Sequence, residues 1–325
     1  MQASRPSSYA RSCSALSRLR RDAATLRWAH GAFRRTKPRG FHGLRFIVRS
    51  LWNFRASVRW FAHLRDSPSL KKTRASADML QLPHRPYFDY RLRALEVVNL
   101  LISHQRLVTE RFDQILCKRL ELGRPCAISE IVGKSGEVYS VVLSQEGRFM
   151  KEGLLSLSLI AAGEMVMSLT VTFAERQSGH SALIGGLQAC GNKPTERLRH
   201  LTHELHGIQP RLLLLHVLRM MCHQLKITRI EAVSARNHVF QSARYRLKKT
   251  LHLAYEKLWE MVGGTERGDG NYDIPVVAPR KPLSSYPSKK RCEHKRRFDL
   301  IDRMEVQVAA AFKGPGRILH LKSAA

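Results

Sequence analysis

The sequence predicts an α+β protein in which a mixed, mostly antiparallel sheet is flanked by helices. The first observation is alternation at period two, with Val, Leu, Ser and Thr prominent, in residues 138–143, 153–159 and 164–173. Gly163 marks a tight turn between the last two segments. The second observation is the order of the next segments along the chain: a glycine-broken strand over 181–189, an apolar helix over 210–225, and a strand over 227–234.

Residues 1–75 are expected to form a basic, Arg-rich extension. They hold 18 Lys and Arg and only two acidic residues, Asp22 and Asp66. Apolar side chains at steps of three and four predict one amphipathic helix within residues 41–65. These side chains are Leu44, Ile47, Leu51, Phe54, Val58 and Phe61. With arginines between them, such a helix either lies on an anionic membrane or packs on the main domain, and the sequence leaves both alternatives open.

The main domain is expected to span residues 76–310, after a turn-rich linker over 66–86. Periodicity and the placement of Pro and Gly predict its other helical segments. These lie from Tyr90 to Leu122, from Pro194 to Gly207, after Asn237 as far as Val262, and over the basic stretch 287–311. Residues 311–325 form a tail.

The formal net charge of +30 predicts affinity for a polyanion. An anionic membrane surface and an envelope component are the partners we expect, whereas nucleic acid is supported by charge alone. The six cysteines include no CxxC pair, which favours a reducing compartment. Without an apolar run of about 18 residues or a secretory signal core, we expect a cytoplasmic protein, either free or peripheral at the inner membrane. The sequence predicts no oligomeric state.

Metal and nucleotide motifs are not evident in the sequence. His200, His203 and His206 recur every three residues, so they fan around a helix, and the metalloprotease motif needs histidines four apart. We therefore expect no metal site. GxSxG, Walker A and GxGxxG motifs do not occur, which removes the main support for hydrolase, P-loop and Rossmann interpretations.

The order of the later elements resembles that of GNAT-type acyltransferases. In that fold, a strand bulge and the N–H groups at the start of the next helix bind acyl-CoA, and a tyrosine protonates the departing thiolate. The resemblance implies acyl-CoA as the cofactor and Tyr245 as the proton donor, and Glu256 is a further candidate acid or base. The cofactor contacts would come from Gly185, Gly186, Gln188, Gly207, Gln209, Arg211 and Asn237.

The turn before the apolar helix departs from the phosphate loop of that fold. Gly207 is its one glycine, and Pro210 has no N–H to offer a phosphate. Pro210 also suits the first turn of an ordinary helix. The segment is therefore either a phosphate-binding loop or a helix cap, and the sequence does not choose between them.

Several ordered blocks resemble the VirK/YbjX family of bacterial proteins. They are MKEGLLSLSL (150–159), IGGLQAC (184–190), LTHELHGIQPRLLL (201–214), IEAVSARNHV (230–239) and YPSKKRCEHKRRFDLID (286–302). The resemblance implies a role in envelope homeostasis, virulence, stress response or resistance to antimicrobial peptides. Two mechanisms stay open: acyl-CoA-dependent acyl transfer, and non-catalytic binding of an anionic membrane or a partner protein. The anion-binding candidates on the C-terminal helix are Lys289, Lys290, Arg291, Arg296 and Arg297.

Overall fold

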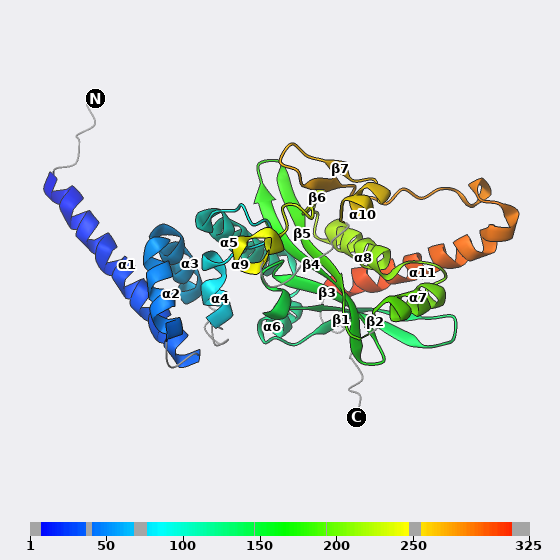
Figure 1. Ribbon diagram of the computed structural model, residues 1–325, viewed down its shortest axis with the longest axis horizontal. Helices are drawn as coiled ribbons and strands as arrows, with labels where there is room; N and C mark the ends of the chain where they lie inside the picture. The colour runs from blue at the N-terminus through cyan, green and yellow to red at the C-terminus, as the bar shows by residue number, and fades with distance from the viewer. Residues whose placement is uncertain are drawn as a thin grey trace. The chain divides into compact units, whose positions relative to one another are not determined.

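The computed structural model describes residues 8–36, 41–67, 77–145, 147–192, 194–246 and 255–313 (Figure 1). The chain divides into two compact units. The first contains the described residues of 1–85 and 93–102, and the second those of 86–92 and 103–325. Among the described residues, no helix is both long and apolar enough to cross a membrane.

The first unit is helical. Its elements are α1 (Ser8–Thr36), α2 (Phe41–Trp52), α3 (Phe54–Asp66), α4 (Ala77–Gln81), the 3-10 turn η1 (Leu82–His84) and the beginning of α5 (Ala94–Arg111). Phe46 of α2 stacks on Phe33 of α1 with ring centroids 4.2 Å apart, and it also meets Phe61 of α3. Trp60 donates from Nε1 to the carbonyl oxygen of Met79 at 2.9 Å. Aromatic side chains thus hold the four helices together.

The amphipathic stretch predicted as one helix is divided in two at Asn53. The backbone of Asn53 has φ −104° and ψ 42°, and its amide donates to the carbonyl oxygen of Arg49 at 3.3 Å. An asparagine that bonds to local backbone competes with helix continuation, which accounts for the break. The two halves differ in burial, because Trp60 and Phe61 of α3 are fully buried whereas Leu44 and Leu51 of α2 are exposed.

The second unit is built on a mixed sheet, which confirms the predicted fold class. Within the described residues, eight strands lie in the order β1-β2-β3-β4-β5-β6-β8-β7. All neighbours are antiparallel except β5 and β6, which are parallel. The strands are β1 (Cys126–Val132), β2 (Val138–Ser144), β3 (Leu155–Ala161), β4 (Glu164–Arg176), β5 (Gly179–Ala189), β6 (Arg229–Ala232), β7 (Thr265–Glu266) and β8 (Tyr272–Ile274).

The centre of the sheet is buried on both faces. Leu157, Leu169 and Leu187 lie opposite one another on β3, β4 and β5 and form an apolar layer on one face. Ser158 and Ser168 are buried on the other face, with their hydroxyl oxygens 3.2 Å apart. Gly163 makes the predicted tight turn between β3 and β4 with a positive φ of 75°, as two-residue hairpin loops require.

Helix α8 (Pro210–Gln224) connects β5 to β6, as predicted, and packs against β3 and β4. Helix α7 (Pro194–Glu204) packs against α8 and β4, and α11 (Ser288–Phe312) against α8 and β1. The remaining helical elements of this unit are the end of α5, α6 (Gln114–Glu121), α9 (Ala243–Arg246), α10 (Tyr255–Met261) and the 3-10 turns η2 (Gly147–Phe149), η3 (Val239–Gln241) and η4 (Leu283–Ser285).

The helix predicted over 90–122 is in fact two helices, α5 and α6. Asp113 separates them and caps α6, because its carboxylate accepts from the backbone N–H groups of Ile115 at 2.9 Å and Leu116 at 3.4 Å. An Asp in this position satisfies N–H groups that have no partner within the helix.

Candidate functional site

A pocket of about 590 Å³ opens beside the start of α8. Its walls come from β4, β5, α7, α8 and α10. The lining residues are Met167, Leu187, Thr195, Leu198, Arg199, Thr202, Gln209, Pro210, Arg211, Tyr255 and Leu258. This volume and this mixture of an apolar lining with a few polar groups are typical of small-molecule sites.

The pocket forms where the parallel strands part. Strand β5 pairs with β6 as far as Ile184, which lies opposite Ala232, and then continues without this partner to Ala189. Beyond that point the Tyr255 side chain bonds the edge of β5, since its hydroxyl accepts from the N–H of Leu187 at 2.9 Å and lies 3.4 Å from the Leu187 carbonyl oxygen. Burial raises the pKa of Tyr255, so its phenol stays protonated at neutral pH.

The glycine pair of β5 forms the predicted bulge. The group that approaches these glycines closely is another part of the same chain, Glu152. The register with β4 shifts between Thr170 and Val171, opposite Gly185. A Cβ on Gly185 would overlap the carbonyl oxygen of Glu152, and one on Gly186 would overlap its carboxylate. Gln188 donates to that carboxylate at 2.9 Å. These three residues enclose the buried Glu152, and none of them lines the pocket; their assignment as cofactor contacts stays a prediction.

Gly207 caps the end of a helix and does not line the pocket, and its assignment as a cofactor contact stays a prediction. It has φ +83°, and its N–H donates to the carbonyl oxygen of Thr202 at 2.7 Å, closing the end of α7. The guanidinium of Arg297 occupies the space that a Cβ on Gly207 would need. Both the N–H and the open side of this glycine are therefore already used within the chain.

Gln209 and Arg211 do lie in the wall of the pocket. Gln209 precedes α8 and Pro210 fills its first position, so the two side chains flank the helix start. Arg211 donates from Nε to Oε1 of Gln209 at 2.7 Å, which orients its guanidinium. Arg199 and Thr202 approach from α7 on another wall. The structure thus gathers two arginines and two hydrogen-bonding side chains beside an apolar cavity.

Tyr245 and Glu256 do not border the pocket, and their catalytic role stays a prediction. Tyr245, on α9, packs edge-on against Phe240 at 5.9 Å between ring centroids. Glu256, on α10, accepts from the backbone N–H of Ala235 at 2.8 Å and so fixes the loop after β6. Both residues serve the local structure of the segment that follows β6.

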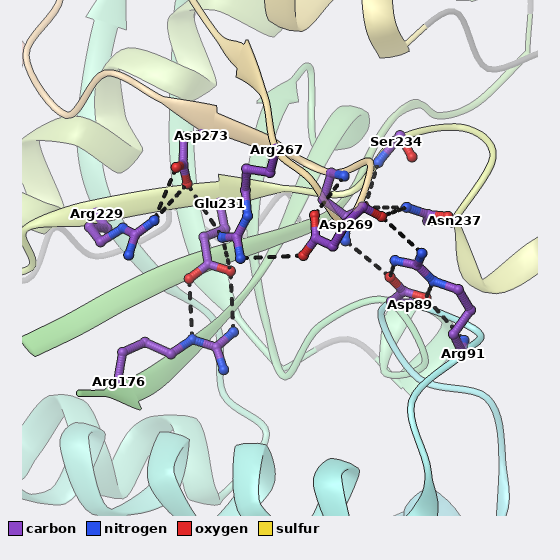
Figure 2. A network of polar contacts seen from close by, with 11 residues as sticks. Asp89, Arg91, Arg176, Arg229, Glu231, Ser234, Asn237, Arg267, Asp269 and Asp273 are labelled. Carbon is purple, nitrogen blue, oxygen red and sulfur yellow. Dashed lines mark hydrogen bonds and ion pairs between the residues drawn. The ribbon is translucent and has the colours of Figure 1, made fainter. Parts of the chain in front are cut away.

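Asn237 belongs to a polar network of this unit, shown in Figure 2, and does not line the pocket; its assignment as a cofactor contact stays a prediction. Its amide donates to the carbonyl oxygen of Asp269 and to Oδ1 of Asn271, each at 3.1 Å. Asn271 in turn donates to Asp89 at 3.0 Å. Ion pairs complete the network: Arg91–Asp89, Arg176–Glu231, Arg267–Glu231, Arg267–Asp269, Arg267–Asp273 and Arg229–Asp273. The network joins residues 89–91 to β6 and to the β7–β8 hairpin, and its charges are matched internally.

The basic side chains of α11 fall into two groups. Arg297 donates to the carbonyl oxygen of His206 and to Glu293, and Arg291 donates to the carbonyl oxygens of Tyr286 and Ser284. These two arginines therefore stabilise the chain's own turns. Lys289, Lys290 and Arg296 are exposed, and none of the five anion-binding candidates lines the pocket.

Sequence patterns did not single out Tyr255 or Glu152 as site residues. An aromatic side chain on a helix is most often a core residue, and Tyr255 is indeed buried. Glu152 lies within the block MKEGLLSLSL, but only the bulge at Gly185 reveals why a carboxylate is held there. Among the described residues, no group of His, Cys, Asp and Glu side chains is arranged to hold a metal ion.

Comparison with known proteins gives one family. A family model described as a protein of unknown function (DUF535) matches residues 37–310. The uncharacterised protein YbjX of Escherichia coli (strain K12) is 30% identical over 275 residues, which cover 83% of each chain. An uncharacterised protein of Haemophilus influenzae is 22% identical over 224 residues, covering 68% of this chain and 73% of the relative.

Two solved structures are also similar, both of a cAMP-binding acyltransferase from Mycobacterium smegmatis, one being a point mutant. Their sequence identities are 13% and 11%, and their TM-scores are 0.28 and 0.29. The matches cover 72% and 73% of this chain and 66% of each of those chains. At these TM-scores the likeness establishes neither the fold nor an activity.

Proposed function

This chain belongs to the DUF535 family of proteins of unknown function, and from the pocket at the start of α8 we propose that it binds acyl-CoA and transfers the acyl group. The observation that carries the proposal is the position of the pocket. It lies where the parallel strands β5 and β6 part, beside the first turn of the helix that connects them. The N–H groups of Leu212 and Leu213 donate to the carbonyl oxygen of Gln209, so the attraction of this helix start for an anion comes from the helix dipole.

The lining of the pocket suits a ligand that is apolar at one end and anionic at the other. Met167, Leu187, Leu198 and Leu258 offer apolar surface for an acyl chain. Arg199 and Arg211 offer guanidinium groups, which bind phosphate oxygens by charge-assisted hydrogen bonds. An acyl thioester of coenzyme A has both features.

Tyr255 is the residue that we propose for proton transfer, in place of Tyr245. Its hydroxyl lies at the edge of β5 and its side chain lines the pocket. The phenol is protonated at neutral pH, so it has a proton to give to a departing thiolate, although burial raises its pKa and so makes it a weaker acid. The resemblance to VirK/YbjX proteins supports an acceptor in the bacterial envelope, and we extend the proposal to a role in envelope homeostasis, virulence or stress response.

Calorimetric titration of the full chain tests the proposal. The ligands are CoA, acetyl-CoA, longer acyl-CoAs and the free fatty acids of the same chain lengths. We expect acyl-CoA to bind more tightly than either CoA or the fatty acid, with a gain of about fourfold for each added methylene until the pocket is filled. The proposal is wrong if no acyl-CoA binds at millimolar concentration, and binding of fatty acids alone would replace it with a lipid-binding protein.

Arg211→Ala locates the binding site. We expect it to weaken acyl-CoA binding by about tenfold, because a charge-assisted hydrogen bond to a phosphate is lost. Lys257→Ala is the matched control, since Lys257 is exposed on α10 and does not line the pocket. Equal affinities of the two variants would place the ligand elsewhere on the protein.

A further inference from the structure

One helix of the first unit exposes apolar side chains along its length. We define the outer face of α2 as Phe41, Leu44, Ile47, Val48, Leu51 and Trp52. All of these except Ile47 are more than half exposed, and Trp52 is 88% exposed. Their spacing of three and four residues places them on one side of the helix. They form a contiguous apolar stripe and are not scattered single residues.

The opposite side of α2 already anchors the helix to its own unit. Phe46 is buried between Phe33 and Phe61, and the buried Ser50 donates to the carbonyl oxygen of Phe46 at 2.8 Å. The outer face is therefore not needed to fold this unit. In α3, by contrast, Trp60 and Phe61 are buried, so this part of the amphipathic stretch packs against the protein.

The three helices α1, α2 and α3, which carry and support the outer face, are strongly basic in composition. Arg45 is exposed on α2 itself, one turn after Phe41 and within one turn of Val48. Arg55 and Arg59 of α3 are also exposed, as are Arg27, Arg34 and Arg35 of α1. In the described residues of these three helices, Asp22 and Asp66 are the only acidic side chains. Apolar contact at the outer face would therefore come with attraction for negative charge.

We propose that the outer face of α2 docks on the surface of a membrane that contains anionic phospholipid. An interfacial helix inserts its apolar side chains at the boundary of the acyl chains, and flanking arginines bind phosphate head groups. Trp52 suits the level of the head groups, where tryptophan is enriched. A second copy of the chain fits less well, because two equally basic surfaces repel each other at low salt. This inference is independent of acyl-CoA binding, which concerns the second unit.

Vesicle flotation with the full chain tests the proposal. Vesicles of phosphatidylcholine with phosphatidylglycerol are expected to bind the protein, vesicles of phosphatidylcholine alone to bind it weakly, and added salt to weaken the binding. Brominated lipid is expected to quench tryptophan fluorescence in the wild type and much less in Trp52→Phe, because Trp60 and Trp259 are buried and Trp28 is partly buried. Failure to bind anionic vesicles overturns the proposal, and so does equal quenching in the two proteins.

The double variant Leu44→Ser, Leu51→Ser removes apolar contact without changing charge. We expect it to weaken vesicle binding by at least about tenfold. Val306→Ser is the control, because Val306 is an equally exposed apolar residue, at 71%, on α11. Unchanged thermal unfolding would show that both variants are folded. If the double variant binds as well as the wild type, or if it instead abolishes a dimer that salt strengthens, the outer face is not a membrane surface.

Discussion

The hydroxyl of Tyr255 supplies a hydrogen-bond partner that a neighbouring strand would otherwise provide. Where β6 ends, β5 loses its parallel partner, and the N–H of Leu187 would be buried without a hydrogen bond if Tyr255 did not accept one. Because an unpaired buried N–H is costly, this contact has a structural role whatever the ligand. The same hydroxyl lies at the wall of the pocket, so one side chain both closes the sheet edge and faces the site that we propose for acyl-CoA.

Tyr255→Phe is therefore expected to lower the free energy of unfolding by about 1 to 2 kcal/mol, because the Leu187 N–H loses its acceptor. Chemical denaturation measures this change. Tyr245→Phe is the control and is expected to have almost no effect, since Tyr245 is only partly buried and makes ring contacts. Similar losses in both variants would mean that the hydrogen bond at Leu187 contributes little.

At the scale of elements, the bulge of β5 depends on an approach that only glycine permits. The backbone of Glu152 lies where a Cβ on Gly185 would be, and backbone cannot move aside as a flexible side chain can. The bulge also shifts the register of β5 with β4 just before Leu187, which lines the pocket. The glycine thus affects the position of the pocket without lining it.

Gly185→Ala is expected to destabilise the protein by more than about 2 kcal/mol, because overpacking here displaces backbone. Gly268→Ala serves as the control, since no atom lies within 4 Å of its added Cβ. Thermal unfolding of the two variants, measured side by side, decides the matter. If Gly185→Ala unfolds at the temperature of Gly268→Ala, the segment around Glu152 adjusts more easily than its packing indicates.

The elements that periodicity predicted are those whose environment is regular. The alternation in β3 and β4 and the apolar α8 are direct consequences of burial, so the sequence showed them. Strand β1 was missed because a register shift between Ala127 and Ser129 interrupts its alternation, and β7 and β8 because they span only two and three residues. The helix breaks at Asn53 and Asp113 depend on hydrogen bonds made by one side chain each, which apolar periodicity does not report.

The sequence predicted part of the residues that line the pocket and did not predict the others. Gln209 and Arg211 followed from the start of α8, which is a local signal. Tyr255 reaches Leu187 across 68 residues of sequence, and Glu152 meets Gln188 across 36. Long-range contacts of this kind arise from the order of strands in the sheet, and a single sequence contains no periodic trace of them.

At the scale of the whole molecule, buried neutral histidines connect folding to pH. His104 and His238 are each 1% exposed. Burial lowers the pKa of His104 to about 3. Burial is also the main reason that the pKa of His238 is lowered to about 4; the charge of Lys151 contributes to this lowering, and a backbone hydrogen bond with Gly185 opposes it. Nδ1 of His104 accepts from the N–H of Phe173 at 2.9 Å, and Nδ1 of His238 accepts from Phe240 at 3.3 Å. Both rings therefore act as hydrogen-bond acceptors within the folded chain.

The direction of the resulting pH dependence follows from these values. Both pKa values lie below the 6.5 of an unfolded histidine, so between pH 6.5 and about 4 the unfolded chain binds more protons than the folded one. Stability contributed by the neutral rings is complete above pH 6.5 and is lost as the pH falls, by up to about 1.4 kcal/mol per histidine for each pH unit. Denaturation curves across this range are expected to show the decline.

His104→Asn keeps an acceptor for Phe173 but does not titrate. The free energy of unfolding should therefore fall less steeply with decreasing pH in this variant than in the wild type or in the variant His223→Asn, which changes an exposed histidine. Parallel slopes for all three proteins would mean that protonation of His104 does not limit stability in acid.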